Sequence, residues 1–556
     1  MRHLIFKENS SYPIALLIKA TALRERDLRT EYVDHLVNQG IPETDIIAFS
    51  LDYDSGSKVS AATKKKYLSN LLPALQSLGT HTLLVADANY FKTLTGETKA
   101  VPHYGYVLPC AIKPFEHINV ILAPNYQSFF YNPALTEKRD MAINTLVSHY
   151  QGTYTEIGSS IIHSATYPTS FKEIASWLET LKQYPMLASD IEAYSLQFWK
   201  TGIATIAFAW DEHNGIAFRV RDAVKPLLAQ FFEQYHGHII WHNANYDMKI
   251  IVNDLWMDTL LDEVGKQRGI EIMCRNFHDT KLITYLATNS TAGNNLGLKT
   301  QAHEFAGNYA QDDINDITLI PEPELLEYNL VDALATFYVY KKHYPTMIQD
   351  QQENIYNTIF KPSVKVILQM ELTGMPLNME KVYEARSELQ DIVIDSLDQI
   401  RAFPLIEDML DQLTRIKWEK DYQTRKAKAK NPDKIKPKPL NSYMIHFRVV
   451  FNPDSNHQIQ YLMYTMLGLP VIDLTDGKDP SVGGKTLKKL KNHTTDPKVH
   501  ELIDALRTYY DASKVLDTFI KAFIENSVQK ENGWYYLHGS FNLGGTVSGR
   551  LSSSKP

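Results

Sequence analysis

The chain has 556 residues, of which 44% are hydrophobic and 22% charged, an ordinary composition for a globular protein of about three or four domains. Its two cysteines, Cys110 and Cys274, exclude a disulfide framework and a cysteine-rich zinc site and favour the cytoplasm. The charged N-terminus and the lack of an apolar run of about 18 residues exclude a signal peptide and a membrane span. The formal net charge of −7 leaves nucleic acid open as a partner.

Residues 1–165 alternate short apolar strands, at 82–86 and 118–122, with polar helical stretches. This alternation predicts a small α/β domain. The segment shows no constellation of residues that suits catalysis, so we expect a structural or docking domain.

Residues 166–350 are expected to form a second α/β domain. An amphipathic helix at 171–183 precedes a buried strand at 186–191. A hairpin, a helix and another strand follow, and this order predicts a mixed sheet rather than a uniformly parallel one. The expected elements after the first strand are strands 203–210 and 215–220, helix 224–235, strand 238–241, and helices 279–287 and 322–343.

Residues 351–556 are expected to be mainly helical. A basic stretch at 415–438 interrupts the helices and holds ten lysines and arginines against three acidic residues, a net charge of +7. With Trp418 and Tyr422 interleaved, it can grip the backbone of a nucleic acid duplex, or it can be a solvated helix and linker. The expected helices are 364–372, 379–401 and 498–525.

Four carboxylates fall in three short motifs of the middle domain. Asp190 and Glu192 are two residues apart on a predicted strand, so both side chains point to one face. Asp247 follows a later strand, and Asp332 lies four residues after Tyr328 on one face of a predicted helix. Each motif alone is common, whereas the three in this order are much harder to obtain by chance. Four carboxylates without histidine or cysteine partners favour Mg²⁺ or Mn²⁺.

Together these motifs resemble the DEDD-type 3′→5′ proofreading exonuclease domain of DNA polymerases, which has an RNase H-like fold. The resemblance implies that Asp190, Glu192, Asp247 and Asp332 bind two Mg²⁺ or Mn²⁺ ions, which stabilise the attacking and leaving oxygens of a phosphoryl displacement. It implies that Tyr328 orients the attacking water, as in the DEDDy subclass.

Three neighbours of these motifs extend the resemblance. Leu196 matches a leucine that wedges against the terminal base, although a plain core position stays open for it. Asn243 matches an asparagine that contacts DNA near the second acidic position. Asp279 begins the segment D-T-K-L-I-T-Y-L, and we expect it to cap a helix or support the site rather than bind metal.

Several segments of residues 351–556 follow a second known pattern. The most specific is T-V-S-G-R-L-S-S-S-K-P at 546–556, in which Ser548 replaces the usual threonine. These segments resemble family A DNA polymerases, the family of bacterial DNA polymerase I and its phage relatives, and imply a thumb region and the start of a palm. The other matching segments are M-E-L-T-G-M-P-L at 370–377, F-N-P-D-S at 451–455, K-T-L-K-K-L at 485–490, and Thr518-Phe519. The residues that would contact DNA are Arg507, Lys514, Thr546, Arg550, Ser552 and Ser553.

The sequence given ends inside the last of these motifs. The resemblance implies that the metal-binding aspartates of the palm and the fingers helix are not included, so we expect synthesis only with a second polypeptide that supplies palm and fingers. A natural split subunit and a truncation both stay open. We expect part of a phage-type polymerase in the host-cell cytoplasm, which removes 5′-mononucleotides from a single-stranded 3′ end and binds the primer–template duplex.

Two other interpretations stay open. A stand-alone exonuclease of the RNase D type would act on RNA, which the thumb-like region argues against. A non-catalytic scaffold would bind DNA with carboxylates that hold no metal, which the complete set of four carboxylates and a tyrosine argues against.

Residues 1–165 loosely resemble the N-terminal domain of some phage polymerases and folds of the uracil-DNA glycosylase type. The resemblance rests on A-D-A-N-Y-F at 86–91, Y-G-Y at 104–106 and A-P-N-Y at 123–126. An active glycosylase would carry a histidine before its late loop, where this chain has A-P-N. We therefore expect no base excision.

Overall fold

The computed structural model describes residues 2–554 apart from 56–57, 289–294, 310–315 and 430. The chain divides into two compact units. Unit 1 holds Met1–Thr373 and Phe541–Ser553, and unit 2 holds Gly374–Ser540 and Ser554–Pro556. Within the described residues, no helix combines the length and the apolar character that a membrane crossing requires.

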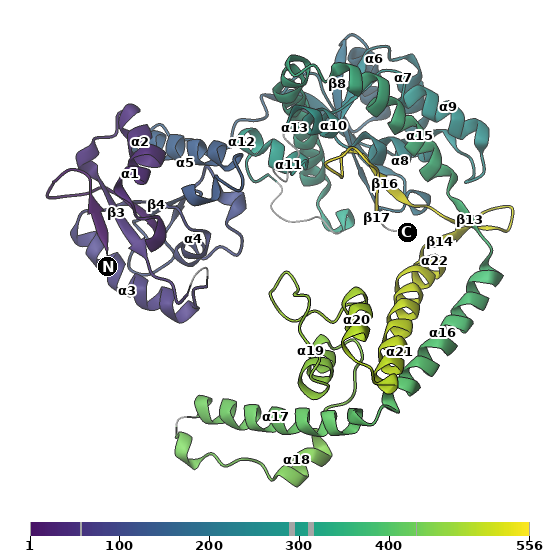
Figure 1. The fold of residues 1–556 in the computed structure, drawn as a ribbon. Coiled ribbons are helices and arrows are strands. Elements are labelled where there is room, and N and C mark those ends of the chain that lie inside the picture. Colours follow the sequence, from purple (N-terminus) through teal and green to yellow (C-terminus); the bar gives the residue numbers. More distant parts are fainter. Residues whose placement is uncertain (1, 56–57, 289–294, 310–315, 430, 555–556) are drawn as a thin grey trace. The chain divides into compact units, whose positions relative to one another are not determined.

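The first part of unit 1 is a six-stranded sheet in the order β1-β3-β2-β4-β6-β5 (Figure 1). Its four central strands are parallel, and the edge strands β1 and β5 run antiparallel to their neighbours. Helices cover both faces, which makes the expected α/β domain doubly wound. One face is covered by α3 (Ala61–Ser77) and α4 (Ala88–Thr95), and the other by α2 (Asp34–Asn38) and α5 (Leu135–Tyr150). The strands are β1 (His3–Ile5), β2 (Ile14–Lys19), β3 (Ile46–Leu51), β4 (Thr82–Val85), β5 (Val107–Pro109) and β6 (Asn119–Leu122).

The second sheet of unit 1 has the order β12-β11-β8-β9-β10-β7. Strands β8, β9 and β10 form antiparallel pairs, whereas β11 runs parallel to both β8 and β12. The sheet is therefore mixed, as the order of the elements predicts. Edge strand β7 pairs with β10 and straddles the expected boundary at residue 165. The strands are β7 (Ser164–Thr166), β8 (Met186–Ala193), β9 (Ile203–Ala209), β10 (Asn214–Arg219), β11 (His238–Trp241) and β12 (Phe277–Asp279).

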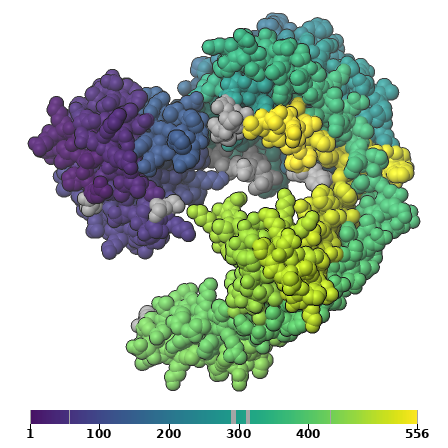
Figure 2. Space-filling model, viewed as in Figure 1, coloured from purple at the N-terminus to yellow at the C-terminus, as the bar shows by residue number. Residues whose placement is uncertain are grey.

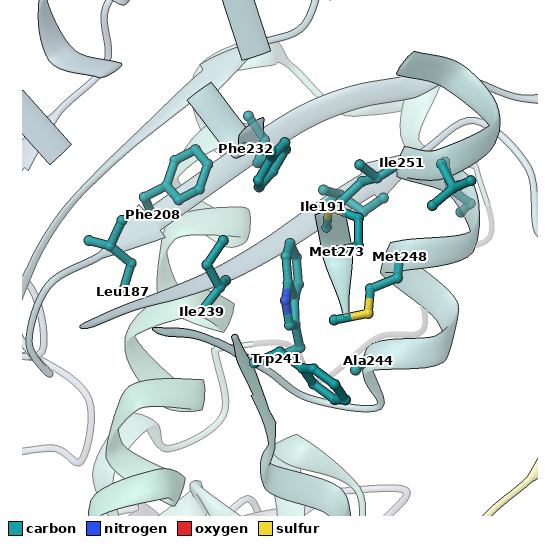
Figure 3. Packing of buried hydrophobic residues seen from close by; sticks show 14 of the residues in the cluster. Leu187, Ile191, Phe208, Phe232, Ile239, Trp241, Ala244, Met248, Ile251 and Met273 are labelled. Carbon is teal, nitrogen blue, oxygen red and sulfur yellow. The ribbon is translucent and has the colours of Figure 1, made fainter. Parts of the chain in front are cut away.

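The two faces of this sheet differ in side-chain size. Successive residues of a strand point to opposite faces, and large side chains such as Phe208 pack on one face against helices that include α8 (Ala244–Trp256). Figure 3 shows this core around Trp241. The other face carries small residues and is covered by α13 (Glu322–Gln349). The small residues are Ala188, Ala207, Ala209 and Ala217. Because their side chains are short, α13 can lie close to β8.

The expected helices of this region are present with small shifts at their ends. Ser170 caps α6 through a capping box: its side chain accepts from the Glu173 amide, and the Glu173 side chain accepts from the Ser170 amide. This fixes the start of the helix. The helices are α6 (Phe171–Leu181), α7 (Lys225–Gln234), α9 (Glu263–Met273), α10 (Thr280–Ala287) and α15 (Lys361–Thr373).

Part of the expected polymerase region belongs to unit 1. The segment Phe541–Ser553 lies against α10, where Lys281 Nζ donates to Asn542 Oδ1 at 2.6 Å and Tyr285 OH donates to the Thr546 carbonyl at 2.9 Å. In Figure 2 its yellow atoms lie on the teal surface of this unit. The segment contains most of the hairpin β16 (Ser540–Asn542) and β17 (Ser552–Ser554).

A buried carboxylate anchors the start of the same segment. Glu371 of α15 is fully buried, accepts a hydrogen bond from the Phe541 amide at 2.7 Å and pairs with Lys249 Nζ of α8 at 2.5 Å. Helix α15 and the hairpin are thus held on the exonuclease-like fold, although the sequence assigns both to the region after residue 350.

Unit 2 is mainly helical, as predicted, with one core and a small sheet. The expected helix at 379–401 is α16 (Met379–Arg401), whereas the helix expected at 498–525 divides into α21 (Pro497–Lys514), a π-helical turn (Val515–Ile520) and α22 (Lys521–Asn526). The remaining elements are α17 (Leu405–Lys428), α18 (Leu440–His446), α19 (Asn456–Gln460), α20 (Gly484–Leu490), β13 (Met375–Leu377), β14 (Ser527–Gln529) and β15 (Tyr535–Leu537).

The basic stretch does not interrupt the helices at its start, contrary to the prediction. The first half of this stretch is the C-terminal part of α17. Lysine and arginine favour helices, and the stretch contains no proline before Pro432. The chain then turns back, and Trp418 Nε1 donates to the Lys438 carbonyl at 2.8 Å. The stretch is thus the end of a helix followed by a segment that returns along it to Lys438, which we call the strap.

Candidate active site

Three of the four predicted carboxylates meet at one point of the second sheet. Asp190 and Glu192 lie on β8, on the same face as Ala188, and Asp332 lies on α13, which covers that face. Each of the three offers a carboxylate oxygen within 4.8 Å of those of the other two. The short alanine side chains make this approach possible.

The fourth carboxylate, Asp247, lies beside this cluster. It belongs to α8, is 3% exposed, and its Oδ1 accepts a hydrogen bond from the Ile191 amide at 3.3 Å. Ile191 stands between Asp190 and Glu192, so Asp247 approaches β8 through the backbone of the D-I-E motif.

Burial dominates the electrostatics of the cluster. Burial, followed by the charges of the other carboxylates, raises the pKa of Asp190 well above its usual range. Burial also raises the pKa of Glu192 to about 8 and that of Asp332 to about 6. Buried carboxylates that repel one another either keep protons or take up a cation. An oxygen-only set of this kind suits a hard divalent ion.

Two side chains that the sequence analysis missed hold the carboxylates. Asn329 is fully buried on α13, and its Nδ2 donates to Asp190 Oδ2 at 2.7 Å. Tyr309 donates its hydroxyl to Asp332 Oδ1 at 2.6 Å. Asn329 lies inside the Y-N-L-V-D motif, where a polar residue between apolar ones could have signalled a role. Tyr309 gives no such signal, because nothing in its sequence neighbourhood links it to Asp332.

Tyr328 lies at the same site. Burial, and then the charge of Asp332, raises the pKa of its phenol, so the hydroxyl keeps its proton. The Lys299 ammonium lies 5.3 Å from the centre of the Tyr328 ring. The site therefore carries a neutral hydroxyl next to a cation.

Asp279 caps α10, as predicted. Its carboxylate accepts hydrogen bonds from the amides of Lys281, Asn243 and Ala244, at 2.9, 3.0 and 3.0 Å. Asn243 adopts a left-handed backbone (φ 64°), and its Oδ1 accepts from Lys281 Nζ at 3.0 Å. The side chain expected to contact DNA is thus engaged within the protein.

The remaining predicted contact residues are distributed over both units. Leu196 is 66% exposed, so the alternative of a plain core position is wrong. Arg507 and Lys514 lie on α21 of unit 2. In unit 1, the Thr546 hydroxyl donates to the Arg550 carbonyl at 2.8 Å and closes the hairpin turn. The other two hairpin residues, Ser552 and Ser553, lie on β17.

Two family models match the chain. The model described as 3′-5′ exonuclease matches residues 166–345, and the model described as DNA polymerase family A matches residues 421–556. The chain thus carries a 3′–5′ exonuclease domain and a region of the family A DNA polymerases. Its polymerase domain is partial.

Relatives of this chain include a phage and a bacterial protein. The DNA polymerase of Bacillus phage SP01 is 21% identical over 477 residues, 80% of this chain and 49% of the relative. DNA polymerase I of Chloroflexus aurantiacus is 23% identical over 413 residues, 69% of this chain and 36% of the relative. A solved structure, the POL domain of Pol1 from M. smegmatis in complex with DNA primer-template and dNTP, is 16% identical with a TM-score of 0.47 and covers 71% of this chain and 55% of that one. The chain thus spans about half the length of the phage polymerase and about a third of the length of the Chloroflexus polymerase.

Proposed function

We propose that this chain removes nucleotides from the 3′ end of DNA by metal-dependent hydrolysis, as the proofreading part of a family A polymerase. The observation that carries the proposal is the meeting of Asp190, Glu192 and Asp332 within 4.8 Å, inside the segment that matches the exonuclease model. The alternative of a scaffold without metal is disfavoured, because burial raises the pKa of all three carboxyl groups and neighbouring carboxylates raise those of Asp190 and Glu192 further.

The exonuclease domain implies a divalent metal, and the four carboxylates would hold two Mg²⁺ or Mn²⁺ ions. When bound, the ions supply an activated water and stabilise the departing 3′ oxygen. Asp190, Glu192, Asp247 and Asp332 would bind the ions through their carboxylate oxygens. Tyr328, which keeps its proton, orients the attacking water through its hydroxyl. Leu196, exposed next to β8, packs against the terminal base.

We assign DNA binding to the polymerase-like parts of the chain. The exposed lysines and arginines of α17 and of the strap after it would contact the duplex backbone. Synthesis of DNA would need the palm and fingers of the family, which a second polypeptide would supply. The residues proposed to contact the primer–template are Arg507, Lys514, Thr546, Arg550, Ser552 and Ser553.

Digestion of a 5′-labelled single strand tests the exonuclease proposal. With Mg²⁺ the purified chain should shorten the strand from its 3′ end and release 5′-mononucleotides, and EDTA should stop the reaction. An RNA strand of the same sequence should be digested more slowly. Preference for RNA would favour an enzyme of the RNase D type, and DNA binding without any shortening would favour a scaffold.

A further inference from the structure

A small basic cavity lies next to the carboxylates within unit 1. It has a volume of about 160 Å³. Residues of both domains of unit 1 line it: Lys138 belongs to α5 of the first domain, and Lys299, His303 and Asn308 belong to the second domain. None of the described residues that line it is acidic. A cavity with two lysines and no carboxylate favours an anion.

Among the described residues, carboxylates act on the two lysines only from beyond ion-pair distance, Glu304 on Lys138, and Glu192 and Asp332 on Lys299. In the described part of the chain, neither Lys138 nor Lys299 forms an ion pair, and the nearby Glu304 is engaged by Lys342 at 2.5 Å and by the Tyr338 hydroxyl at 2.6 Å. Lys138 is half-buried, and this burial lowers the pKa of its ammonium, while the charge of Glu304 raises it. An anion in the cavity would compensate the cost of this burial.

The cavity is also lined by His303 and Asn308. His303 Nε2 is bonded to the Tyr104 carbonyl at 2.7 Å. Asn308 Nδ2 is buried and has no hydrogen-bond partner among the described residues. A buried N–H group without a partner is costly, but this one has almost no accessible surface, so an anion in the cavity would reach it only if the Asn308 side chain moved.

Lys299 connects the cavity to the catalytic site. Its ammonium lies 5.3 Å from the ring centre of Tyr328, and its charge lowers the pKa of both Glu192 and Asp332. A larger neighbouring cavity of about 550 Å³ is lined by Glu137, Asp140 and Glu304 and would repel a phosphate. Of these two cavities, only the smaller has a lining that favours a phosphate.

We propose that the cavity between Lys138 and Lys299 binds a backbone phosphate of the single strand whose 3′ end lies at the carboxylates. This inference rests on the exonuclease activity proposed above. It gives the first domain a function, because Lys138 extends the substrate site of the exonuclease domain. The occupant is a phosphodiester upstream of the scissile one.

Comparing two substrates distinguishes binding of an upstream phosphate from hydrolysis of the scissile one. A DNA oligonucleotide offers upstream phosphates, whereas the 4-nitrophenyl ester of 5′-thymidylate offers only the scissile phosphodiester. Lys138→Met and Lys299→Met should each raise KM for the oligonucleotide by about three- to tenfold, with KM for the ester unchanged in Lys138→Met. Each should reduce the salt dependence of oligonucleotide binding by about 0.7 in the log–log slope. Lys66→Met, an exposed lysine on α3, is the matched control and should change neither.

A scan with neutral linkages identifies the phosphate. Replacing single phosphates of the oligonucleotide by methylphosphonates should weaken binding to the wild type at one upstream position, and that position should have no further effect in Lys138→Met. Unchanged oligonucleotide KM and salt slope in both variants would overturn the inference, as would equal effects of Lys138→Met on oligonucleotide and ester. If the wild-type chain hydrolyses neither substrate, the proposed exonuclease itself fails, and the scan read by DNA binding alone still decides the phosphate site.

Discussion

The two sheets of unit 1 each have six strands and helices on both faces, but their strands carry different side chains. In the first sheet, β2 and β3 are buried along nearly their whole length, and helices seal both faces. In the second sheet, β8 begins with buried residues and then carries Asp190 and Glu192 toward α13. Charge at such a position costs free energy unless a cation or a proton compensates it. The acidic cluster of this unit therefore lies where a buried strand stops being apolar on one face.

Removing the carboxylates of the second sheet should have the largest effect on the rate of DNA digestion. Asp190→Ala with Glu192→Ala should slow digestion on the order of a thousandfold or more, because metal ligands supply several kcal/mol of stabilisation to the transition state. Binding of single-stranded DNA should be largely retained. Asp52→Ala, which removes an exposed carboxylate after β3 of the first sheet, should leave digestion unchanged. Equal loss of DNA binding and digestion in the double variant would mean that the acidic cluster is structural.

Removing the hydroxyl that holds Asp332 should have a smaller effect. Tyr309→Phe should lower digestion by about ten- to a hundredfold and raise the Mg²⁺ concentration needed for half-maximal rate, because groups that orient metal ligands have effects of this size. Tyr150→Phe is the matched control, since it loses a tyrosine–carboxylate hydrogen bond of 2.8 Å to Asp45 in the first domain, away from the site. If both variants respond equally to Mg²⁺, Tyr309 has no role in positioning the ligand.

The smallest effect is expected on the pH dependence of the chain's thermal stability. The pKa of Glu192 is raised from 4.5 to about 8 in the folded chain, so the folded state holds more protons than the unfolded state between these values. The metal-free chain should therefore lose stability as the pH rises through this window. Adding Mg²⁺ should reverse the loss, and Glu192→Gln should flatten the dependence. A thermal melt series from about pH 5 to pH 8.5 measures this, and a Tm that rises with pH in the absence of metal would contradict it.

The sequence predicts the parts of the site that depend on local periodicity. Asp190 and Glu192 share a face because a strand repeats every two residues, and Tyr328 and Asp332 share a side of a helix because a helix repeats every 3.6. Asp279 is predicted as a cap because aspartate before a helix accepts amide hydrogen bonds.

What the sequence does not predict depends on distant contacts. Tyr309 meets Asp332 across 23 residues of chain, and Lys138 approaches the site from another domain. The hairpin at Phe541–Ser553 joins unit 1 through Glu371, Lys281 and Tyr285, although it follows the helices of unit 2 in the chain. No local pattern encodes such pairings, because they arise from tertiary packing.

Mn²⁺ binding followed by electron paramagnetic resonance tests the central claim most directly, namely that Asp190, Glu192 and Asp332 together hold divalent metal. The wild-type chain should bind Mn²⁺ and Mg²⁺ should compete with it, whereas Asp190→Asn with Asp332→Asn should lose this binding and keep a normal thermal melt. Mn²⁺ binding that is the same in the wild type and in the double variant would show that the ions bind elsewhere and would contradict the account.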